Sequence, residues 1–290
     1  VIRRDAGLLP REWDIVLDIS VVIVSTDEGH FLRPCLEALR RAMVGLRAEV
    51  FVVENCCKDD TAAITAAVLP EARLISSPSR CGFARSNNAA LRQAKGRYTL
   101  VLNPDTEVGP DALTTLVRYL DEHPRVGAAG ARLLNPDGTL QHSCRRFPSP
   151  RSVFFRWLPK CPTPVRDRAL RDYLMLDWDH GSARAVDWVM GACLCVRSAA
   201  AERVGLLDEG FRLYYEDIDW CCRMWKGGWE VHYVSDAVVT HHYQRTSAQR
   251  LFSRAFRTHA YSVFRFFLKH RGARLAPTPT PEDRTDDPRP

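Results

Sequence analysis

The chain has neither of the glycine-rich loops that commonly cradle nucleotide phosphates. Its 16 glycines among 290 residues form no G-x-G-x-x-G and no G-x-x-x-x-G-K-[ST] sequence. Because the dinucleotide fingerprint is missing, a nicotinamide-dependent oxidoreductase is a poor interpretation. If a nucleotide binds here, another group must neutralise its phosphates, and a divalent metal held by a carboxylate can do so.

Long apolar runs and paired metal-binding cysteines are also missing. No stretch approaches the length of a membrane span, about 20 apolar residues, and no secretory signal peptide is evident. The ten cysteines form no C-x-x-C, and the adjacent pairs 56–57 and 221–222 are poorly placed to bridge each other. We therefore expect reduced thiols, no zinc site and a cytoplasmic protein.

The excess of positive charge is small. Lys and Arg number 41 against 35 Asp and Glu, which gives a formal net charge of +6. Such an excess fits an anionic small ligand or a membrane surface better than a dedicated nucleic-acid binder, so no nucleic-acid partner is expected. Hydrophobic residues make up 46% of the chain, which is enough to bury a sizeable core.

Strand and helix patterns alternate through the first half of the chain. Apolar runs typical of buried strands lie at 19–24, 50–53, 73–75, 98–102 and 126–129. Between these runs, helices are expected at 30–46, 59–69, 83–94 and 110–122. The alternation predicts an α/β fold with a central, mostly parallel sheet flanked by helices.

The second half of the chain is less regular. An Asn-Pro-Asp-Gly turn at 135–138 predicts a hairpin, while 148–182 shows only weak periodicity. Further elements are expected as strands at 186–196, 231–234 and 237–240 and as helices at 217–226 and 249–270. The proline-rich tail after Ala276 is expected to be disordered.

Acidic residues follow three of the expected strands. Asp27, Glu54 and Asp105 each come at or just after the end of an apolar run. Asn103-Pro104-Asp105 could be only a turn, since all three residue types favour turns. In parallel sheets, however, ligands collect at the carboxyl ends of the strands. Asp105, with Asn103 close by, is a suitable ligand for a Mg²⁺ or Mn²⁺ ion that also contacts phosphates.

Five stretches, in order, carry a family resemblance. They are ISVVIVS (19–25), FVVENCCKDDT (51–61), CGFARSNNAALRQAKGRYTLVLNPDTEV (81–108), VMGACLCVRSAAAERVGLLDEGFRLYYEDIDWCCRMWKGGWEVHYV (189–234) and THHYQRTS (240–247). The set resembles family-2 glycosyltransferases of the GT-A fold, especially bacterial rhamnosyltransferase-like members. The resemblance covers roughly residues 19 to 270.

The resemblance implies a role for particular residues. Nucleotide-binding positions are Ser25, Thr26, Asp27, Glu54, Arg80 and Asn103, and metal-site positions are Asp105 with His241 or His242. Asp217 is implied as the general base, with Glu216 beside it, and acceptor-binding positions are Trp188, Gly191 and Tyr215. Trp188 and Tyr215 could also be core residues, Glu54 could be only a turn residue that precedes a helix, and the histidines could be solvated strand-end residues.

The sequence departs from the family pattern at the nucleotide side. Thr26-Asp27 stands where the family usually has Tyr-Asn, and residues 54–61 read ENCCKDDT in place of Asp-Asn-x-Ser-x-Asp-Gly-Thr. Arg80 replaces the usual Asn two residues before the Gly-Phe pair. These changes affect the base and ribose contacts but leave Asp105 and Asp217 in place.

The resemblance implies an inverting, metal-dependent glycosyltransferase. It would move rhamnose or a similar sugar from a dTDP- or UDP-sugar to a hydroxyl of a glycan, lipid-linked or small-molecule acceptor. The alternative is a non-catalytic GT-A-like module that binds a nucleotide or glycan. The expected organisation is a lead-in (1–18), a nucleotide-sugar half (19–130), an acceptor half of the same domain (131–248), a helix (249–274) and a tail (275–290). That basic amphipathic helix could lie on the inner face of the plasma membrane or pack on the domain.

Overall fold

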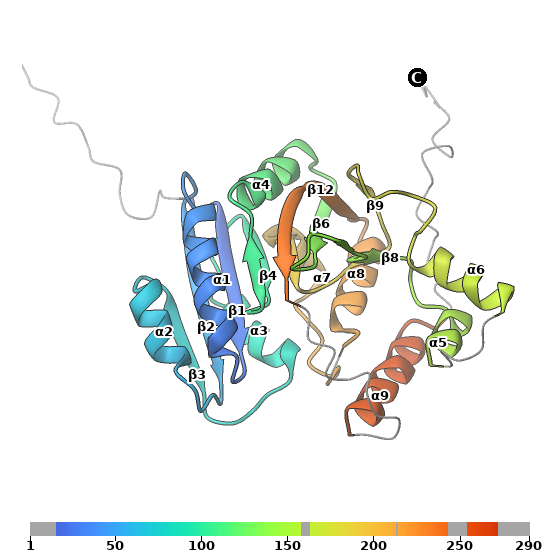
Figure 1. Ribbon diagram of the computed structural model, residues 1–290, viewed down its shortest axis with the longest axis horizontal. Coiled ribbons are helices and arrows are strands. Elements are labelled where there is room, and N and C mark those ends of the chain that lie inside the picture. The colour runs from blue at the N-terminus through green and yellow to red at the C-terminus, as the bar shows by residue number, and fades with distance from the viewer. Residues whose placement is uncertain (1–15, 158–162, 213, 243–253, 272–290) are drawn as a thin grey trace, which may run out of the picture.

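A mixed sheet of ten strands organises the part of the chain that the structure describes (Figure 1). The structure, a computed structural model, describes residues 16–157, 163–212, 214–242 and 254–271. Most of the expected lead-in and all of the expected tail lie outside these residues. Eight strands follow one path across the sheet, in the order β3 (Arg73–Ser77), β2 (Ala48–Asn55), β1 (Ile19–Ser25), β4 (Tyr98–Leu102), β11 (Cys193–Arg197), β6 (Val126–Leu134), β12 (Glu230–His241) and β5 (Thr106–Val108).

The strand directions divide the sheet. β3, β2, β1 and β4 run parallel to one another, as the βα alternation predicts. β11 is antiparallel to both of its neighbours, β4 and β6, while β12 is parallel to β6. Short strands complete the structure: β7 (Leu140–Gln141) pairs with β6, β9 (Arg184–Ala185) pairs with β12, and β8 (Cys144–Arg145) pairs with β10 (Trp188–Val189).

Helices cover both faces of the sheet because the strands are apolar on both sides. In β1, Val21 and Ile23 join one core cluster, while Val22 and Val24 join the other. The first cluster packs under α1 (Gly29–Ala42), α2 (Thr61–Val68) and α4 (Ala112–Glu122). The second packs under α3 (Phe83–Leu91), α7 (Ser198–Val204), α8 (Glu216–Lys226) and α9 (Arg254–Lys269). The near-continuous apolar runs of the sequence therefore mark strands buried on both faces.

The structure corrects several element boundaries. The expected strands at 231–234 and 237–240 are one strand, β12, with a register irregularity between Val234 and Val238. The expected strand at 186–196 is split into β10 and β11. The weakly periodic segment contains two helices, α5 (Pro150–Trp157) and α6 (Pro164–Tyr173), which begin at prolines placed where the missing N–H costs nothing.

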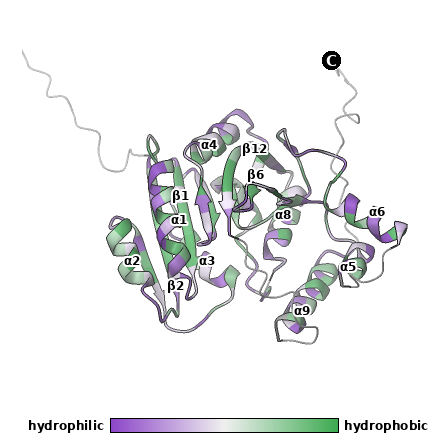
Figure 2. Cartoon of the chain, in the orientation of Figure 1, coloured by the Kyte–Doolittle hydropathy of each residue, from purple (hydrophilic) through white to green (hydrophobic). Residues whose placement is uncertain are grey.

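The C-terminal helix α9 packs on the domain. Phe266 and Val263 are buried in the core cluster beneath it, and Tyr215 contacts the ring of Phe266. At its end, Nε2 of His270 lies 2.9 Å from Oδ1 of Asp219, a fully buried carboxylate on α8. Packing, one of the two alternatives for this helix, is therefore observed, and Figure 2 shows that α9 also carries hydrophilic residues.

No helix in the described residues is long and apolar enough to cross a membrane. The cysteines that the structure describes are all free thiols, as the sequence predicts for that part of the chain. Residue 130, the expected boundary between the two halves, falls inside β6, so both halves belong to one continuous sheet.

Candidate active site

The predicted acidic residues gather at one edge of the sheet. β1, β2 and β4 are neighbouring parallel strands, with Ser25 opposite Glu54 and Ile23 opposite Leu102. Their carboxyl ends therefore meet at one edge, and Asp27, Glu54 and Asp105 lie at or just beyond it. This is the edge at which open α/β sheets bind ligands.

Several predicted nucleotide-binding residues bond to the protein itself. The hydroxyl of Ser25 is buried and lies 3.0 Å from the hydroxyl of Thr61. The Thr26 hydroxyl accepts from the amide of Asn55 at 3.1 Å, and Oε2 of Glu54 accepts from the hydroxyl of Ser76 at 2.9 Å. These bonds fix the loops that follow β1 and β2, whereas the carboxylate of Glu54 stays only half-buried at the edge.

The two segments that depart from the family pattern are in direct contact. Oδ1 of Asp27 accepts from the backbone N–H of Lys58 at 2.7 Å, and its Oδ2 lies 2.9 Å from Nη2 of Arg80. The thiol of Cys57 donates to the carbonyl of Ser25 at 3.1 Å. Because each departing segment supplies partners for the other, the changes at 26–27, 56–60 and 80 form one altered surface.

The ligand atoms of Asp27, Cys57 and Asp59 also lie within 4.8 Å of one another. Both oxygens of each carboxylate are, however, already bonded to groups of the surrounding loops. This cluster therefore serves to join the loops that follow β1 and β2.

Asp105 is a buried carboxylate with an oxygen that lacks a hydrogen-bond partner. Its side chain follows the end of β4, the residue is 7% exposed, and Oδ1 has no hydrogen bond. Nε2 of His241, from the end of β12, lies 3.4 Å from that oxygen. Since a buried polar atom usually has a partner, the orphaned Oδ1 indicates a place for a further ligand.

The side-chain amide of Gln141 orients the imidazole of His241. The Gln141 Nε2 donates to the carbonyl of His241 and to Oδ1 of Asn135, both at 2.7 Å, which fixes the amide. Its Oε1 therefore faces Nδ1 of His241 at 2.9 Å and accepts a hydrogen bond from it. Nδ1 therefore carries a proton and Nε2 faces Asp105, which is how metal-binding histidines are commonly arranged.

His242 has different surroundings. Its Nε2 lies 2.7 Å from Oε1 of Glu107, and its backbone N–H donates to the carbonyl of Asp105. Of the two histidines, His241 is therefore the one whose ring reaches the Asp105 carboxylate. Asp105 and His241 together form a donor set that suits a divalent cation.

Glu28 belongs to the same region, although the sequence interpretation did not include it. Burial raises its pKa to about 7, and the nearby negative charge of Asp105 adds to the increase. Its place directly after Asp27, at the start of α1, was the available signal. Two repelling carboxylates at one sheet edge give the region a strong preference for positive charge.

The segment before β11 connects this edge to the predicted acceptor side. The backbone N–H of Asn103 donates to the carbonyl of Ala192 at 2.9 Å. One residue earlier, the N–H of Gly191 donates to Oδ2 of Asp217 at 3.1 Å. Residues 191–192 therefore link the α8 acid pair to the end of β4.

The acid pair begins helix α8 after an unusual backbone turn. Tyr214 and Tyr215 both have left-handed conformations, with φ of 58° and 74°. Such strain at non-glycine residues is often found at functional sites. The turn directs the two acids differently: Asp217 is half-buried and bonded to Gly191, whereas Glu216 is 6% exposed and its Oε2 has no hydrogen-bond partner.

Burial raises the pKa of both acids. For Glu216 the negative charge of Asp217 adds to the increase. For Asp217 the N–H groups of Gly191 and Ile218 and the positive charge of Arg145 oppose it. The carboxyl of Glu216 is therefore the better place for a proton, and Asp217 is the better anion.

The predicted acceptor residues form the wall behind this pair. Trp188 is 3% exposed and donates from Nε1 to the carbonyl of Arg146, and Tyr215 is 2% exposed. Both rings are thus core residues, the alternative that the sequence left open. Gly191 is also buried, and a Cβ placed on it would lie 3.5 Å from Cβ of Asp217.

Comparison with known families places the chain in one of them. The family described as Glycosyl transferase family 2 matches residues 20–190, which is more than half of the chain. The chain belongs to glycosyltransferase family 2. The prediction of a family-2 glycosyltransferase is therefore confirmed, and the family assignment favours an enzyme over a non-catalytic binding module.

Curated relatives include two rhamnosyltransferases. The chain is 29% identical over 242 residues to N-acetylglucosaminyl-diphospho-decaprenol L-rhamnosyltransferase of Mycobacterium tuberculosis, covering 77% of this chain and 76% of that protein. It is 31% identical over 202 residues to rhamnosyltransferase WbbL of Escherichia coli, covering 66% and 71%. The rhamnosyltransferase-like character of the sequence is thus confirmed as a similarity.

Solved glycosyltransferases share the fold. The structure of GalNAc-T7 with UDP, GalNAc and Mn²⁺ matches with a TM-score of 0.58 at 16% identity, over 79% of this chain and 44% of that one. The mannosyltransferase PcManGT from Pyrobaculum calidifontis, in complex with GDP-Man and Mn²⁺, matches with 0.57 at 19% identity, over 90% and 67%. This chain thus spans from under half to two thirds of these longer proteins, and the predicted GT-A fold is confirmed.

Proposed function

We propose that this protein transfers a sugar from a nucleoside diphosphate donor to an acceptor hydroxyl, with inversion at the anomeric carbon. The observation that carries the proposal is the placement of two acids on opposite sides of one backbone contact. Asp105 lies at the end of β4, and Asp217 is bonded to residue 191, next to the Asn103–Ala192 hydrogen bond. A donor diphosphate at the first acid and a hydroxyl at the second would bring the reacting atoms together.

On the donor side, Asp105 and His241 would hold a divalent cation. The unpartnered Oδ1 of Asp105 and the Nε2 lone pair of His241 fit this role. The cation, Mg²⁺ or Mn²⁺, would offset the negative charge that develops on the diphosphate leaving group. The Mn²⁺ named with both solved structures supports such a requirement.

The nucleoside would lie over the ends of β1 and β2. Glu54 is half-buried at that edge and can accept from a base N–H or a ribose hydroxyl. Arg80, held by Asp27, places a positive group at the same edge. A dTDP- or UDP-sugar is the proposed donor, with rhamnose favoured by the two rhamnosyltransferase relatives.

On the acceptor side, Asp217 would act as the general base. Its carboxylate would take the proton of the acceptor hydroxyl while the oxygen attacks from the face opposite the leaving group. Glu216 is the more deeply buried acid, and its protonated form leaves Asp217 as the only negative charge of the pair. A single displacement of this kind inverts the anomeric configuration.

Helix α9 would contact an anionic membrane from the cytoplasmic side. Its outer face carries Tyr261, Phe264 and Leu268, which are 45%, 66% and 49% exposed. Arg257 and Arg271, at the two ends of the same face, are exposed as well. Aromatic and apolar residues flanked by arginines suit the membrane interface, and a membrane-bound enzyme would meet a lipid-linked acceptor.

A donor screen tests the proposed activity. Candidate nucleotide sugars are incubated with the protein, with Mn²⁺ or with EDTA, and release of the free nucleoside diphosphate is measured. We expect metal-dependent release from one pyrimidine nucleotide sugar. If one donor binds in a metal-dependent way but no donor is turned over, the result would favour the alternative, a non-catalytic GT-A-like module.

A further inference from the structure

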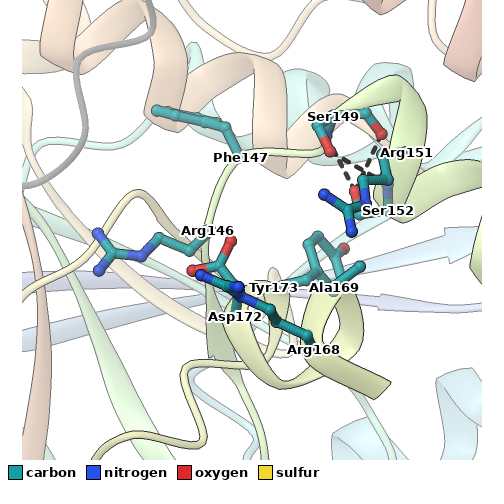
Figure 3. A pocket seen from close by; sticks show the side chains of 9 residues that line it. All are labelled: Arg146, Phe147, Ser149, Arg151, Ser152, Arg168, Ala169, Asp172 and Tyr173. Carbon is teal, nitrogen blue, oxygen red and sulfur yellow. Dashed lines mark hydrogen bonds between the residues drawn. The ribbon is translucent and has the colours of Figure 1, made fainter. Parts of the chain in front are cut away.

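A cavity lies beside the acceptor side, apart from the sheet edge. It has a volume of about 510 Å³ and is lined by nine residues from the segment after β8 and from helices α5 and α6 (Figure 3). None of its lining residues comes from the loops after β1, β2 or β4. The cavity is therefore separate from the proposed donor site.

The lining of this cavity suits an anion. It includes the guanidinium-bearing residues Arg146, Arg151 and Arg168 against one acid, Asp172. Arg146 lies 3.9 Å from a carboxylate oxygen of Asp187, but Arg151 and Arg168 form no ion pair with any residue that the structure describes. Two arginines without acidic partners in one concave site are the usual means of binding phosphate groups.

Serine hydroxyls add polar groups to the α5 side of the same cavity. Ser149 and Ser152 line it and are bonded to each other around the start of α5, as the dashed lines in Figure 3 show. The Ser152 hydroxyl donates to the carbonyl of Ser149, whereas the Ser149 hydroxyl accepts from the N–H of Ser152 and keeps its own proton for a phosphate oxygen.

Two further arginines connect the cavity with the acid pair. Tyr173 is a wall residue of the cavity, and its hydroxyl accepts from Nη1 of Arg156 at 3.0 Å. The guanidinium of Arg145 lies 5.8 Å from the centre of the same ring. The positive charge of Arg145 also reaches Asp217, whose pKa burial raises and Arg145 lowers. Arg145 and Arg156 both contact the wall residue Tyr173, and the charge of Arg145 also acts on the proposed base.

We propose that the cavity binds a phosphate or diphosphate group of the acceptor while the acceptor hydroxyl lies at Asp217. This inference rests on the proposed function, because it needs an acceptor hydroxyl at that carboxylate. The acceptor class is then a sugar phosphate or sugar diphosphate, either attached to a lipid or free. A single extended acceptor would thus place its phosphate groups among the arginines of the cavity and its hydroxyl at the acid pair.

Direct binding measurements on the full chain test the inference. The probes are farnesyl diphosphate and inorganic pyrophosphate, titrated by calorimetry in EDTA so that metal-dependent binding at Asp105 is silent. We expect Arg151→Gln and Arg168→Gln each to weaken probe binding about tenfold, since each removes a charge-assisted contact. The matched control is Arg171→Gln, an exposed arginine of the same helix as Arg168 that does not line the cavity.

The two probes distinguish the source of the phosphate. If pyrophosphate binds as tightly as farnesyl diphosphate, and the cavity variants bind both probes more weakly, the cavity recognises the anion alone. If only farnesyl diphosphate binds, the cavity is built for a lipid-linked acceptor. Both results support the inference, whereas equal affinities in all variants and the control would overturn it.

Hydrolysis of the donor without acceptor separates this inference from the proposed function. We expect the cavity variants to hydrolyse donor at the wild-type rate, because the cavity lies outside the donor site. Lost probe binding with unchanged hydrolysis supports the acceptor cavity. A wild-type protein that binds the probes through these arginines but turns over no donor retains the cavity and overturns the proposed function.

Discussion

The carboxylate of Asp217 accepts a hydrogen bond from the backbone N–H of Gly191 at 3.1 Å. The next residue along the chain bonds the end of β4 through Asn103. The proposed base is therefore positioned by main-chain contacts that also define the donor edge. Any shift of residues 191–192 would move the base relative to the proposed metal ligands, and such misplacement is costly in catalysis.

Asp217→Asn should keep donor binding but lower sugar transfer by about 10²–10⁴-fold, the usual contribution of a positioned general base. The asparagine oxygen can still accept from Gly191, so the local fold should persist. Steady-state transfer and calorimetric donor affinity are the two measurements. Near wild-type transfer by this variant, together with an inactive Glu216→Gln, would reverse the assignment within the pair.

Asp105→Ala should abolish the metal-dependent part of nucleoside diphosphate affinity. The reason is that the variant removes the buried oxygen that now lacks a hydrogen-bond partner. His241→Ala should weaken the same affinity, whereas His242→Ala should affect it less because that ring faces Glu107. Titration of UDP with Mn²⁺ and with EDTA measures the difference. Equal wild-type affinity under both conditions would show that the metal assignment is wrong.

Glu216→Gln should change how stability depends on pH. Burial holds the pKa of Glu216 above its unfolded value, so the folded protein binds the extra proton. The wild-type free energy of unfolding should therefore fall as pH rises, by about 1.4 kcal/mol per pH unit between the two pKa values. The variant has no such proton, so its free energy of unfolding should fall less over the same pH range. Urea unfolding from pH 5 to pH 9 checks this, and parallel curves would contradict the prediction.

Asp219→Asn should destabilise the protein by about 3–5 kcal/mol, since it breaks a buried charge network. The carboxylate is fully buried and bonded to Arg223, Lys269 and His270. Burial opposes its charge, but these partners outweigh burial and lower its pKa, so the stabilisation is present above the unfolded pKa and lost in acid.

The control for that network is Glu209→Gln. Glu209 is paired with Arg92, and its side chain is 36% exposed. Loss of such an exposed pair should cost only about 1 kcal/mol or less. Unfolding in urea at pH 7 compares the two variants, and a similar small cost for both would mean that the Asp219 network does not anchor α9.

The protein should float with anionic liposomes at low salt and detach at high salt. Each arginine near the surface contributes about 1 kcal/mol of attraction to anionic lipid. Phe264→Glu should abolish flotation, because Phe264 is the most exposed of the large apolar side chains that the structure describes on α9. Val44→Glu is the matched control, since Val44 is 77% exposed and lies far away, after α1. Absence of wild-type flotation at low salt would leave α9 with a packing role alone.

The parallel half of the fold could be predicted from the sequence because its signals are local. Runs such as 19–24 and 98–102 are apolar on both faces, and the positions of the acids follow from where these strands end. The insertion of β11 between β4 and β6 could not be predicted, since pairing partners distant in sequence leave no local pattern. Helices α5 and α6 were missed because arginines interrupt their apolar spacing.

The candidate site could likewise be predicted only in part. Asp105 and Asp217 could be named from motifs, but the choice between His241 and His242 needed the geometry of Gln141, a residue about one hundred positions away. Glu28 was passed over because an acid before a helix resembles an ordinary helix start. The cavity formed by Arg151 and Arg168 could not be predicted, because the segment that carries these residues shows only weak periodicity.

The unbroken sheet limits how this enzyme can be recombined with others. β11 comes from the expected acceptor half of the sequence, yet it pairs with both β4 and β6, whose residues come mainly from the expected donor half. A chimera joined near residue 130 would pair a foreign β11 with the native β4 and would have to match its register, from Cys193 opposite Leu102 to Arg197 opposite Tyr98. Donor and acceptor preferences are therefore better exchanged by grafting loops onto the intact sheet than by swapping halves.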